Sequence, residues 1–271
     1  MHKMIGAHVN REKTLKKTIE KLYSYNGNAL QIFTSNPKSL SPANINKYLE
    51  EYELIKDLKC NFVIHSSYTI NIATLDPKQI ELNTKIIITD LLIANKFNAI
   101  GVIVHVGKYV KNNPLDCIKQ MKVFLLYIIT FIKINELKGT KIILETAAGQ
   151  GTEMLVNIDE LIAFTKDFDS NCFSLCFDTC HVWSAGFNII EAYNKIQKET
   201  NNLINVVHFN GSKTQKGSLK DRHDSLFSET NTIPIDVLKQ FANNLKKVMI
   251  ILETPTESEY KKEIEFISKL L

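Results

Sequence analysis

The chain has 271 residues, of which 44% are hydrophobic and 23% charged, proportions that are ordinary for a soluble globular protein with a sizeable core. Its 33 basic and 29 acidic residues leave a net charge of +4, which permits an anionic partner but does not demand one. The chain shows no apolar stretch of the roughly 18 to 20 residues that a membrane span needs, and it enters a strand-like run at once, without a signal peptide. We therefore expect a cytoplasmic protein that does not bind membranes.

Eight short apolar runs recur along the chain, and segments with helical periodicity separate them. Most of the runs are β-branched and apolar throughout, as expected for strands that are buried on both faces of a parallel sheet. In chain order they are "MIGAHV" (4–9), "ALQIFT" (29–34), "FVIH" (62–65), "AIGVIVH" (99–105), "KIILET" (141–146), "FSLCFDTC" (173–180), "INVVHFN" (204–210) and "KVMIILET" (247–254).

The segments between these runs are long enough to hold helices. Residues 81–97 place apolar side chains at i, i+3, i+4 and i+7, which predicts an amphipathic helix. Residues 123–134 read as a packed helix, and residues 234–247 open with a proline near the expected first turn. Strand followed by helix, about eight times, predicts a (β/α)₈ TIM barrel of the α/β class, and an open doubly wound sheet is the alternative. Because no linker or break in composition interrupts the pattern, we expect a single domain over 1–271.

The five cysteines form no C-x-x-C pair. Cys172, Cys176 and Cys180 are spaced by four, which would put them on one side of a strand, too far apart for a disulfide. We expect all five to be reduced and to act as small apolar fillers.

Polar side chains capable of binding metal lie where the predicted strands end. Since the carboxyl ends of the strands of a barrel meet on one face, they should converge there. They are His65, His105, Glu145, Asp178, His181, His208 and Glu253, together with Asp221 and His223 from "KDRHD" between the last two strands. If Asp178 closes an extended strand, Asp178 and His181 should point to opposite sides of the chain and serve one site without sharing one partner.

A single histidine or glutamate at a strand end is more often a core residue, a rim residue or a helix cap. Here nine such residues converge, including five of the chain's seven histidines. Four carboxylates packed together would repel one another, and divalent cations relieve that repulsion. Mixed imidazole and carboxylate ligands favour Zn²⁺, with Mn²⁺ or Fe²⁺ also possible, and nine ligands suit two or three ions rather than one.

The same residues carry a resemblance to a known family. The stretches "IGAHV", "HSSY", "LETAAGQG", "FDTCHVWSAG", "HFNGSK", "DRHDSL" and "ILET" occur in this order and span nearly the whole chain. Together they resemble endonuclease IV, the zinc-dependent apurinic/apyrimidinic (AP) endonuclease of DNA base excision repair. The chain departs from the family pattern at "NREK" after "GAHV", at "HVG", at "NGSK" and at "SET". These changes spare every candidate ligand and alter loops.

The resemblance implies three zinc ions per chain, with Mn²⁺ possible at one site, and no nucleotide cofactor. It assigns His65, His105 and Glu145 to the first ion, and His181, Asp221 and His223 to the third. It assigns Asp178, His208 and Glu253 to the second ion, with Glu145 bridging as the catalytic residue. The implied reaction is hydrolysis 5′ to an abasic site by a water that zinc acidifies, leaving a 3′-hydroxyl and a 5′-deoxyribose phosphate. A 3′-end-cleaning phosphodiesterase activity is implied as well.

The implied partner is double-stranded DNA that contains abasic sites, and we expect a monomeric enzyme. Loops at the top of the barrel carry candidate DNA-contacting residues, and the basic ones among them should contact phosphates. The candidates are Asn36 and Lys38 in "TSNPKS", Tyr68 in "HSSY", and Lys213, Lys216, Lys220 and Arg222 in "GSKTQKGSLKDRH". In the family the loops after strands two and three wedge into the duplex. Tyr68 matches that pattern, whereas Lys38 stands where an arginine is familiar.

Two other functions remain open from the sequence. A sugar isomerase or epimerase on a similar barrel would use one metal set, here Glu145, Asp178, His208 and Glu253, and would lack the other ligands. A non-catalytic DNA-binding or scaffold protein on a decayed barrel would have lost some ligands, and all nine are present.

Overall fold

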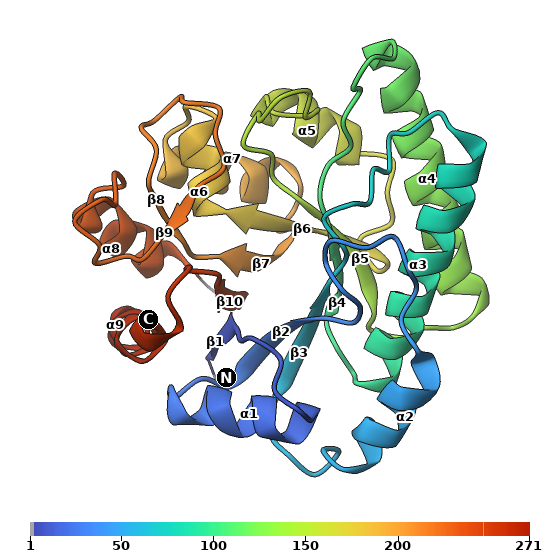
Figure 1. The fold of residues 1–271 in the computed structure, drawn as a ribbon. Helices are drawn as coiled ribbons and strands as arrows, with labels where there is room; N and C mark the ends of the chain where they lie inside the picture. Colours follow the sequence, from blue (N-terminus) through green and yellow to red (C-terminus); the bar gives the residue numbers. More distant parts are fainter. Residues whose placement is uncertain (1–2, 246) are drawn as a thin grey trace.

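The computed structural model describes residues 3–245 and 247–271 and has eight parallel strands closed into a barrel (Figure 1). The barrel confirms the predicted (β/α)₈ architecture and excludes the open sheet. In barrel order the strands are β1 (Met4–His8), β10 (Met249–Leu252), β7 (Ile204–His208), β6 (Phe173–Asp178), β5 (Lys141–Glu145), β4 (Gly101–Val104), β3 (Asn61–His65) and β2 (Ala29–Phe33).

Helices surround the barrel, as Figure 1 shows. Most of them begin after an Asn, Asp or Thr whose side chain accepts a backbone N–H of the first turn, for example Asn113 before α4. The helices are α1 (Leu15–Ser24), α2 (Ile45–Glu53), α3 (Pro77–Lys96), α4 (Pro114–Ile134), α5 (Ile158–Thr165), α6 (Thr179–Ser184), α7 (Ile189–Glu199), α8 (Ile235–Asn244) and α9 (Tyr260–Leu270), with one 3₁₀ turn at Glu257–Glu259. Position 246, within the helical segment expected from the sequence, lies outside the described residues.

Two apolar cores hold this arrangement together. The larger packs the outer faces of the strands against the helices, with Leu91 and Leu161 among its fully buried members. The smaller fills the inside of the barrel with apolar side chains. They are Ala29, Val63, Ile103, Ile143, Cys176, Val206, Met249 and Ile251. Because apolar side chains fill the middle of the barrel, polar groups at the strand ends gather above them. Within the described part of the chain, no helix is long and apolar enough to cross a membrane.

The sixth strand corrects one expectation. It ends at Asp178, whose carboxylate accepts the backbone N–H of His181 at 2.8 Å and so starts α6 immediately. Asp178 and His181 are therefore three residues apart at a helix start and do not point to opposite sides of an extended chain. The expected placement of three cysteines on one side of a strand changes as well. Cys172 precedes β6, Cys176 faces the barrel interior and Cys180 lies in α6. All five cysteines are free thiols.

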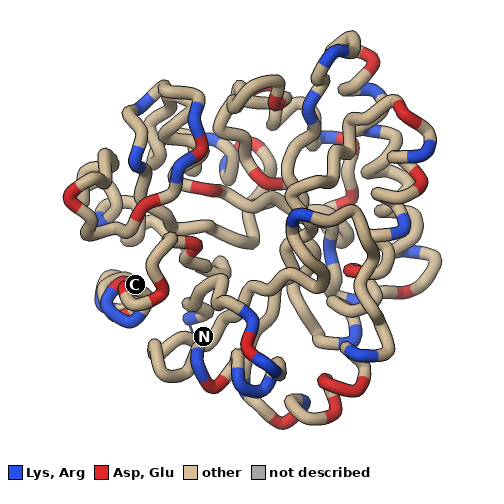
Figure 2. The backbone as a smooth tube through the Cα atoms, viewed as in Figure 1, with Lys and Arg blue, Asp and Glu red and all other residues tan. Residues whose placement is uncertain are grey.

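A two-stranded antiparallel ribbon, β8 (Gly211–Ser212) and β9 (His223–Asp224), projects from the long connection between β7 and α8. Its backbone brings the residues after His208 back over the carboxyl ends of the barrel strands. Lysines and arginines are interspersed with acidic residues around the molecule, without one face of a single charge in the view of Figure 2. The small net charge is therefore spread over helices and loops alike.

Candidate metal centre

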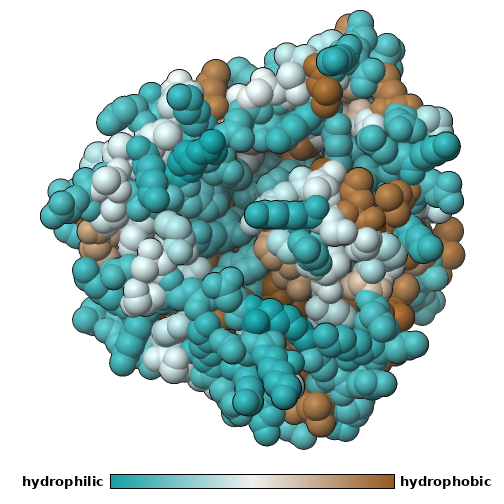
Figure 3. Space-filling view, viewed as in Figure 1, coloured by the Kyte–Doolittle hydropathy of each residue, from teal (hydrophilic) through white to brown (hydrophobic). Residues whose placement is uncertain are grey.

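A cleft of about 450 Å³ opens at the carboxyl ends of the strands. Figure 3 shows a hollow near the middle of the face in view, with hydrophilic residues around it. The lining residues are His65, Tyr68, His105, Lys108, Glu145, Gln150, Glu153, His181, Lys213, Asp221, Arg222, His223, Glu253 and Pro255. A larger cavity of about 570 Å³ lies at the opposite barrel end, among residues such as Met4 and Asn61, and among its described lining residues there is no His, Asp or Glu. Seven of the nine candidate ligands line the smaller cleft.

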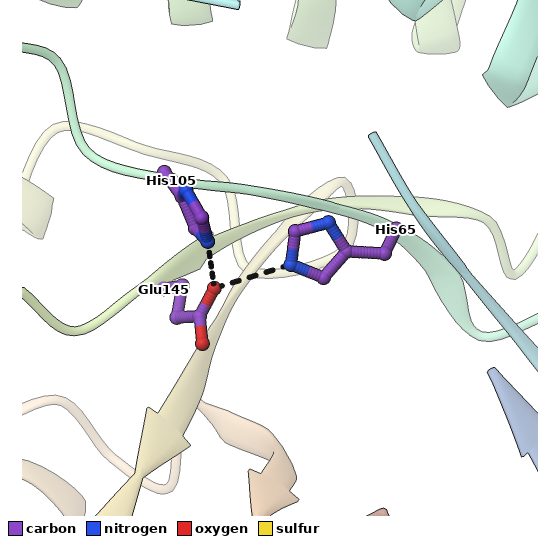
Figure 4. Close-up of side chains that lie close together, drawn as sticks. All are labelled: His65, His105 and Glu145. Carbon is purple, nitrogen blue, oxygen red and sulfur yellow. Dashed lines mark hydrogen bonds and ion pairs between the residues drawn. The ribbon is translucent and has the colours of Figure 1, made fainter. Parts of the chain in front are cut away.

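The first ligand group joins the ends of β3, β4 and β5. The Oε2 atom of Glu145 lies 3.3 Å from Nε2 of His65 and 3.0 Å from Nε2 of His105 (Figure 4). The Nδ1 of His65 donates to the backbone carbonyl of Ser66 at 2.8 Å, so its Nε2 is free to act as a ligand. Burial lowers the pKa of His65, which favours the neutral imidazole that metals bind.

The second group lies at the ends of β5, β6, β7 and β10, where one ligand atom each from Glu145, Asp178, His208 and Glu253 falls within 4.8 Å of the others. The Nδ1 of His208 is 2.7 Å from Oε1 of Glu145 and 3.0 Å from Oε2 of Glu253. Burial alone would raise the pKa of Glu145, but the positive charges of His208 and His105 outweigh it and hold that pKa well below its usual range. Glu145 therefore presents a carboxylate to both groups.

The third group gathers around the β8–β9 ribbon. Asp221 lies 3.3 Å from Nε2 of His181 and 3.2 Å from Nε2 of His223. Asp178 reaches this group as well, since its Oδ2 is 3.5 Å from Nε2 of His223. Asp178 and His181 can thus share one partner with His223, which the expectation of an extended chain had excluded. The Nδ1 of His181 donates to the carbonyl of Thr146 at 2.7 Å and directs Nε2 into the cleft.

These residues fit divalent cations in two independent ways. The Nε2 atoms of His181 and His223 are buried, and although Asp221 lies 3.3 and 3.2 Å away, the geometry gives neither atom a hydrogen bond within the described residues, which is costly unless another ligand binds them. Burial alone would lower the pKa of His181, but Asp178 and Asp221 raise it well above its usual range. A bound cation can replace such protons as the charge that compensates the carboxylates. The donor set of nitrogen and oxygen atoms suits zinc.

The expected DNA-contacting residues divide into two sets. Tyr68, 51% exposed, stacks on the His105 ring at 5.6 Å, and Lys213 and Arg222 are exposed side chains that line the cleft. Asn36, Lys38, Lys216 and Lys220 are exposed and lie outside the cleft lining. The loops after β2 and β3 are tied together, because the Pro37 carbonyl accepts from the Tyr68 N–H at 3.1 Å and the Ser67 hydroxyl at 2.8 Å.

Several residues of the site were not anticipated from the sequence. Asn210 donates to Asp178 at 2.8 Å and accepts the backbone N–H of Glu253 at 2.8 Å. Gln150 accepts from the Asp221 backbone N–H at 3.2 Å and thereby supports the third group. Gln31 contacts two candidate ligands from β2. A usable signal for Gln31 is an amide within an otherwise apolar strand, "ALQIF".

Comparisons with known proteins show which proteins this chain is similar to. A family model described as "Xylose isomerase-like TIM barrel" matches residues 19–270. Proteins named probable endonuclease 4 are 30% identical to this chain in Clostridium botulinum, over 97% of both chains, and in Staphylococcus saprophyticus, over 98% of this chain and 95% of that protein.

Two solved structures share the fold at 22% identity. Endonuclease IV from Thermus thermophilus has a TM-score of 0.76 and covers 99% of this chain and 100% of its own. A D-tagatose 3-epimerase-like protein has a TM-score of 0.75 and covers 95% and 94%. Because nuclease and epimerase share the barrel so closely, the fold alone does not distinguish the two activities.

Proposed function

Because the chain belongs to the endonuclease IV family, we propose that it is an AP endonuclease that hydrolyses the phosphodiester bond 5′ to an abasic site in double-stranded DNA. The products would be a 3′-hydroxyl and a 5′-deoxyribose phosphate, with 3′-end cleaning as a second activity. The observation that supports this most is the convergence of the expected ligands of all three groups on one cleft. An epimerase needs only the group of Glu145, Asp178, His208 and Glu253.

We propose three zinc ions per chain, with Mn²⁺ acceptable at one position. The first would be held by His65, His105 and Glu145, and the third by His181, Asp221 and His223. The second would be held by Asp178, His208 and Glu253, with Glu145 bridging. Bound here, zinc supplies the Lewis acidity that phosphodiester hydrolysis at neutral pH requires.

The chain's own residues would hold the substrate and set the charge of the site. Glu145, kept ionised by His105 and His208, presents one oxygen to each of two groups and so determines their separation. Lys213 and Arg222 bring positive charge to the cleft edge, where phosphates of the DNA backbone would bind. Tyr68 would stack in the gap at the abasic site, and Asn36 and Lys38 would contact the duplex farther out.

The remaining features of the proposal concern the chain as a whole. It would act as a monomer and as a single domain over 1–271, in the cytoplasm with the DNA, and without a nucleotide cofactor. The absence of a long apolar helix from the described residues is compatible with this.

Cleavage of a duplex with one abasic site tests the proposal, and Glu145→Gln is the most informative variant. The amide keeps the shape of the side chain but removes the charge that both groups share, so single-turnover cleavage should fall by several orders of magnitude. Glu229→Gln, an exposed exchange in the "SET" loop, is the matched control and should cleave like the wild type.

The metal content of the wild type and of both variants is measured alongside the cleavage assay, after dialysis against a weak chelator. Near-native cleavage by Glu145→Gln would remove Glu145 from the mechanism. A wild type that leaves abasic duplexes intact while epimerising sugars with one ion per chain would favour the epimerase.

A further inference from the structure

Gln31 is a fully buried amide in the middle of β2, a strand that carries none of the nine candidate ligands. Its Oε1 lies 2.8 Å from Nε2 of His208. Its Nε2 lies 2.5 Å from Oε1 of Glu253 and 3.0 Å from Nδ1 of His8. Both ends of one amide therefore bind residues at the second ligand group.

The donor and acceptor roles in this network follow from the partners. An ionised carboxylate only accepts, so the Gln31 amide nitrogen must face Glu253, and the amide oxygen must then face His208. An amide oxygen only accepts, which places a proton on Nε2 of His208. The Nδ1 of His208 is consequently the atom turned toward Glu145 and Glu253, at 2.7 and 3.0 Å.

Gln31, which is not among the residues that line the cleft, also restrains Glu253. The Oε1 of Glu253 accepts from Gln31, while its Oε2 is the atom near Nδ1 of His208. His8 receives the remaining amide hydrogen at Nδ1 and so keeps the amide from rotating. One side chain of β2 thus orients one ligand from the end of β7 and another just after β10.

A side chain at position 31 that only filled space would not need the amide group of Gln31. Ala29, two residues earlier on the same side of β2, belongs to the apolar cluster inside the barrel. An apolar residue at position 31 would extend that cluster toward the carboxyl ends of the strands. The buried amide is tolerated because its polar atoms are paired with His208, Glu253 and His8.

We propose that Gln31 is a positioning residue that holds Nδ1 of His208 and Oε2 of Glu253 in the orientation that binds an ion. The inference rests on the proposed metal use and assigns Gln31 to the second group alone. Partners of this kind, behind the ligands themselves, change metal affinity by about 10–100-fold when they are removed.

Zinc binding by the wild type, Gln31→Met and Gln197→Met tests the proposal without DNA. Methionine is close to glutamine in length and lacks its hydrogen-bonding groups. Gln197 is a suitable control because it hydrogen-bonds the backbone of Ile204, at the far end of the strand that carries His208. Each protein is stripped of metal and titrated with zinc against a chromophoric chelator, and its thermal unfolding is measured with and without zinc.

In Gln31→Met we expect one zinc ion to bind about 10–100-fold more weakly and the other ions to keep their affinities to within about threefold. Gln197→Met should lower the unfolding temperature alike with and without zinc and leave every zinc affinity unchanged. Unchanged zinc affinities in Gln31→Met, or equal weakening of all ions, would overturn the proposal.

A measurement on the wild type covers the case in which Gln31→Met does not fold. Nitrogen-15 NMR of the zinc-loaded protein should show Nε2 of His208 protonated and Nδ1 shifted by the metal. Zinc binding at Nε2 with a proton on Nδ1 would contradict the assignment. If the zinc titration and the NMR measurement give the expected results but the protein leaves abasic DNA intact, the proposed function is wrong and the role of Gln31 still holds.

Discussion

The pKa of a buried carboxyl in this protein depends on which groups surround it, as Asp90 and Glu145 show. The carboxyl of Asp90 in α3 is buried, and within the described structure its one side-chain hydrogen bond comes from the Thr34 hydroxyl. Burial raises the pKa of Asp90 to about 7, although the bond from Thr34 lowers it. Glu145 is equally buried but lies among histidines, and its pKa is lowered. Two carboxyls of similar burial therefore have opposite preferences.

Asp90→Asn should remove a pH-dependent loss of stability. The folded protein keeps the Asp90 proton up to about pH 7, whereas an unfolded chain loses it near the ordinary value of about 3.9. Between these values the folded state binds more protons, so the contribution of Asp90 to stability falls as pH rises and levels off above pH 7. The variant should equal the wild type near pH 4 and exceed it by up to roughly 4 kcal/mol at pH 8.

Urea unfolding at several pH values measures this difference. A difference that is independent of pH would show that Asp90 is ionised in the folded protein. All other residues are the same in both proteins, so their contributions cancel in the comparison.

At the scale of elements, α9 ties two loops of the site to each other. Its buried Glu263 accepts from the Ser225 hydroxyl at 2.5 Å, the Leu226 N–H at 2.7 Å and the Thr254 hydroxyl at 3.0 Å. Ser225 follows β9 directly, and Thr254 follows Glu253 in the chain. A helix on the outside of the barrel thus sets the path of chain segments that carry candidate ligands.

Glu263→Ala should destabilise the protein by about 2–5 kcal/mol, because it leaves a buried N–H and buried hydroxyls without a partner at about 1–3 kcal/mol each. Urea unfolding of the chelator-treated protein measures the loss. Lys261→Ala, at an exposed position of the same helix, is the control and should change stability by less than about 0.5 kcal/mol. Equal stability of the two variants would mean that water reaches these groups.

At the scale of the whole molecule, the barrel and the third ligand group are structurally separable. The β8–β9 ribbon forms a sheet of its own and lies outside the closed barrel. Asp221 and His223 come from this connection, whereas Glu145, Asp178 and His208 end barrel strands. Removing the two ribbon ligands should therefore spare the fold and the other groups.

The double variant Asp221→Ala, His223→Ala is expected to remain folded and to retain about two of three ions. Abasic-site cleavage should fall at least about a thousandfold, because charge stabilisation in the transition state is typically worth several kcal/mol. DNA binding should weaken much less. Metal content and single-turnover rate are the measurements, and an unchanged rate in a variant that has lost an ion would exclude a catalytic role for this group.

Much of this architecture is determined by the sequence alone. The apolar runs predict all eight barrel strands, because a strand buried on both faces has the same apolar pattern in any parallel barrel. The ligand candidates follow from position, since a parallel barrel places every strand end on one face. Strand-end position predicts only that the candidates share one face, and it is the resemblance to endonuclease IV that groups His65, His105 and Glu145, which the structure brings together.

Only the tertiary structure decides how those residues meet. The turn at Asp178 depends on one side-chain hydrogen bond that ends β6 and starts α6, and the apolar pattern of the strand does not encode it. Gln31 reaches His208 and Glu253 across 177 and 222 residues of chain. Such contacts depend on the barrel's closure, which brings β2, β7 and β10 around one interior, and local periodicity carries no information about them.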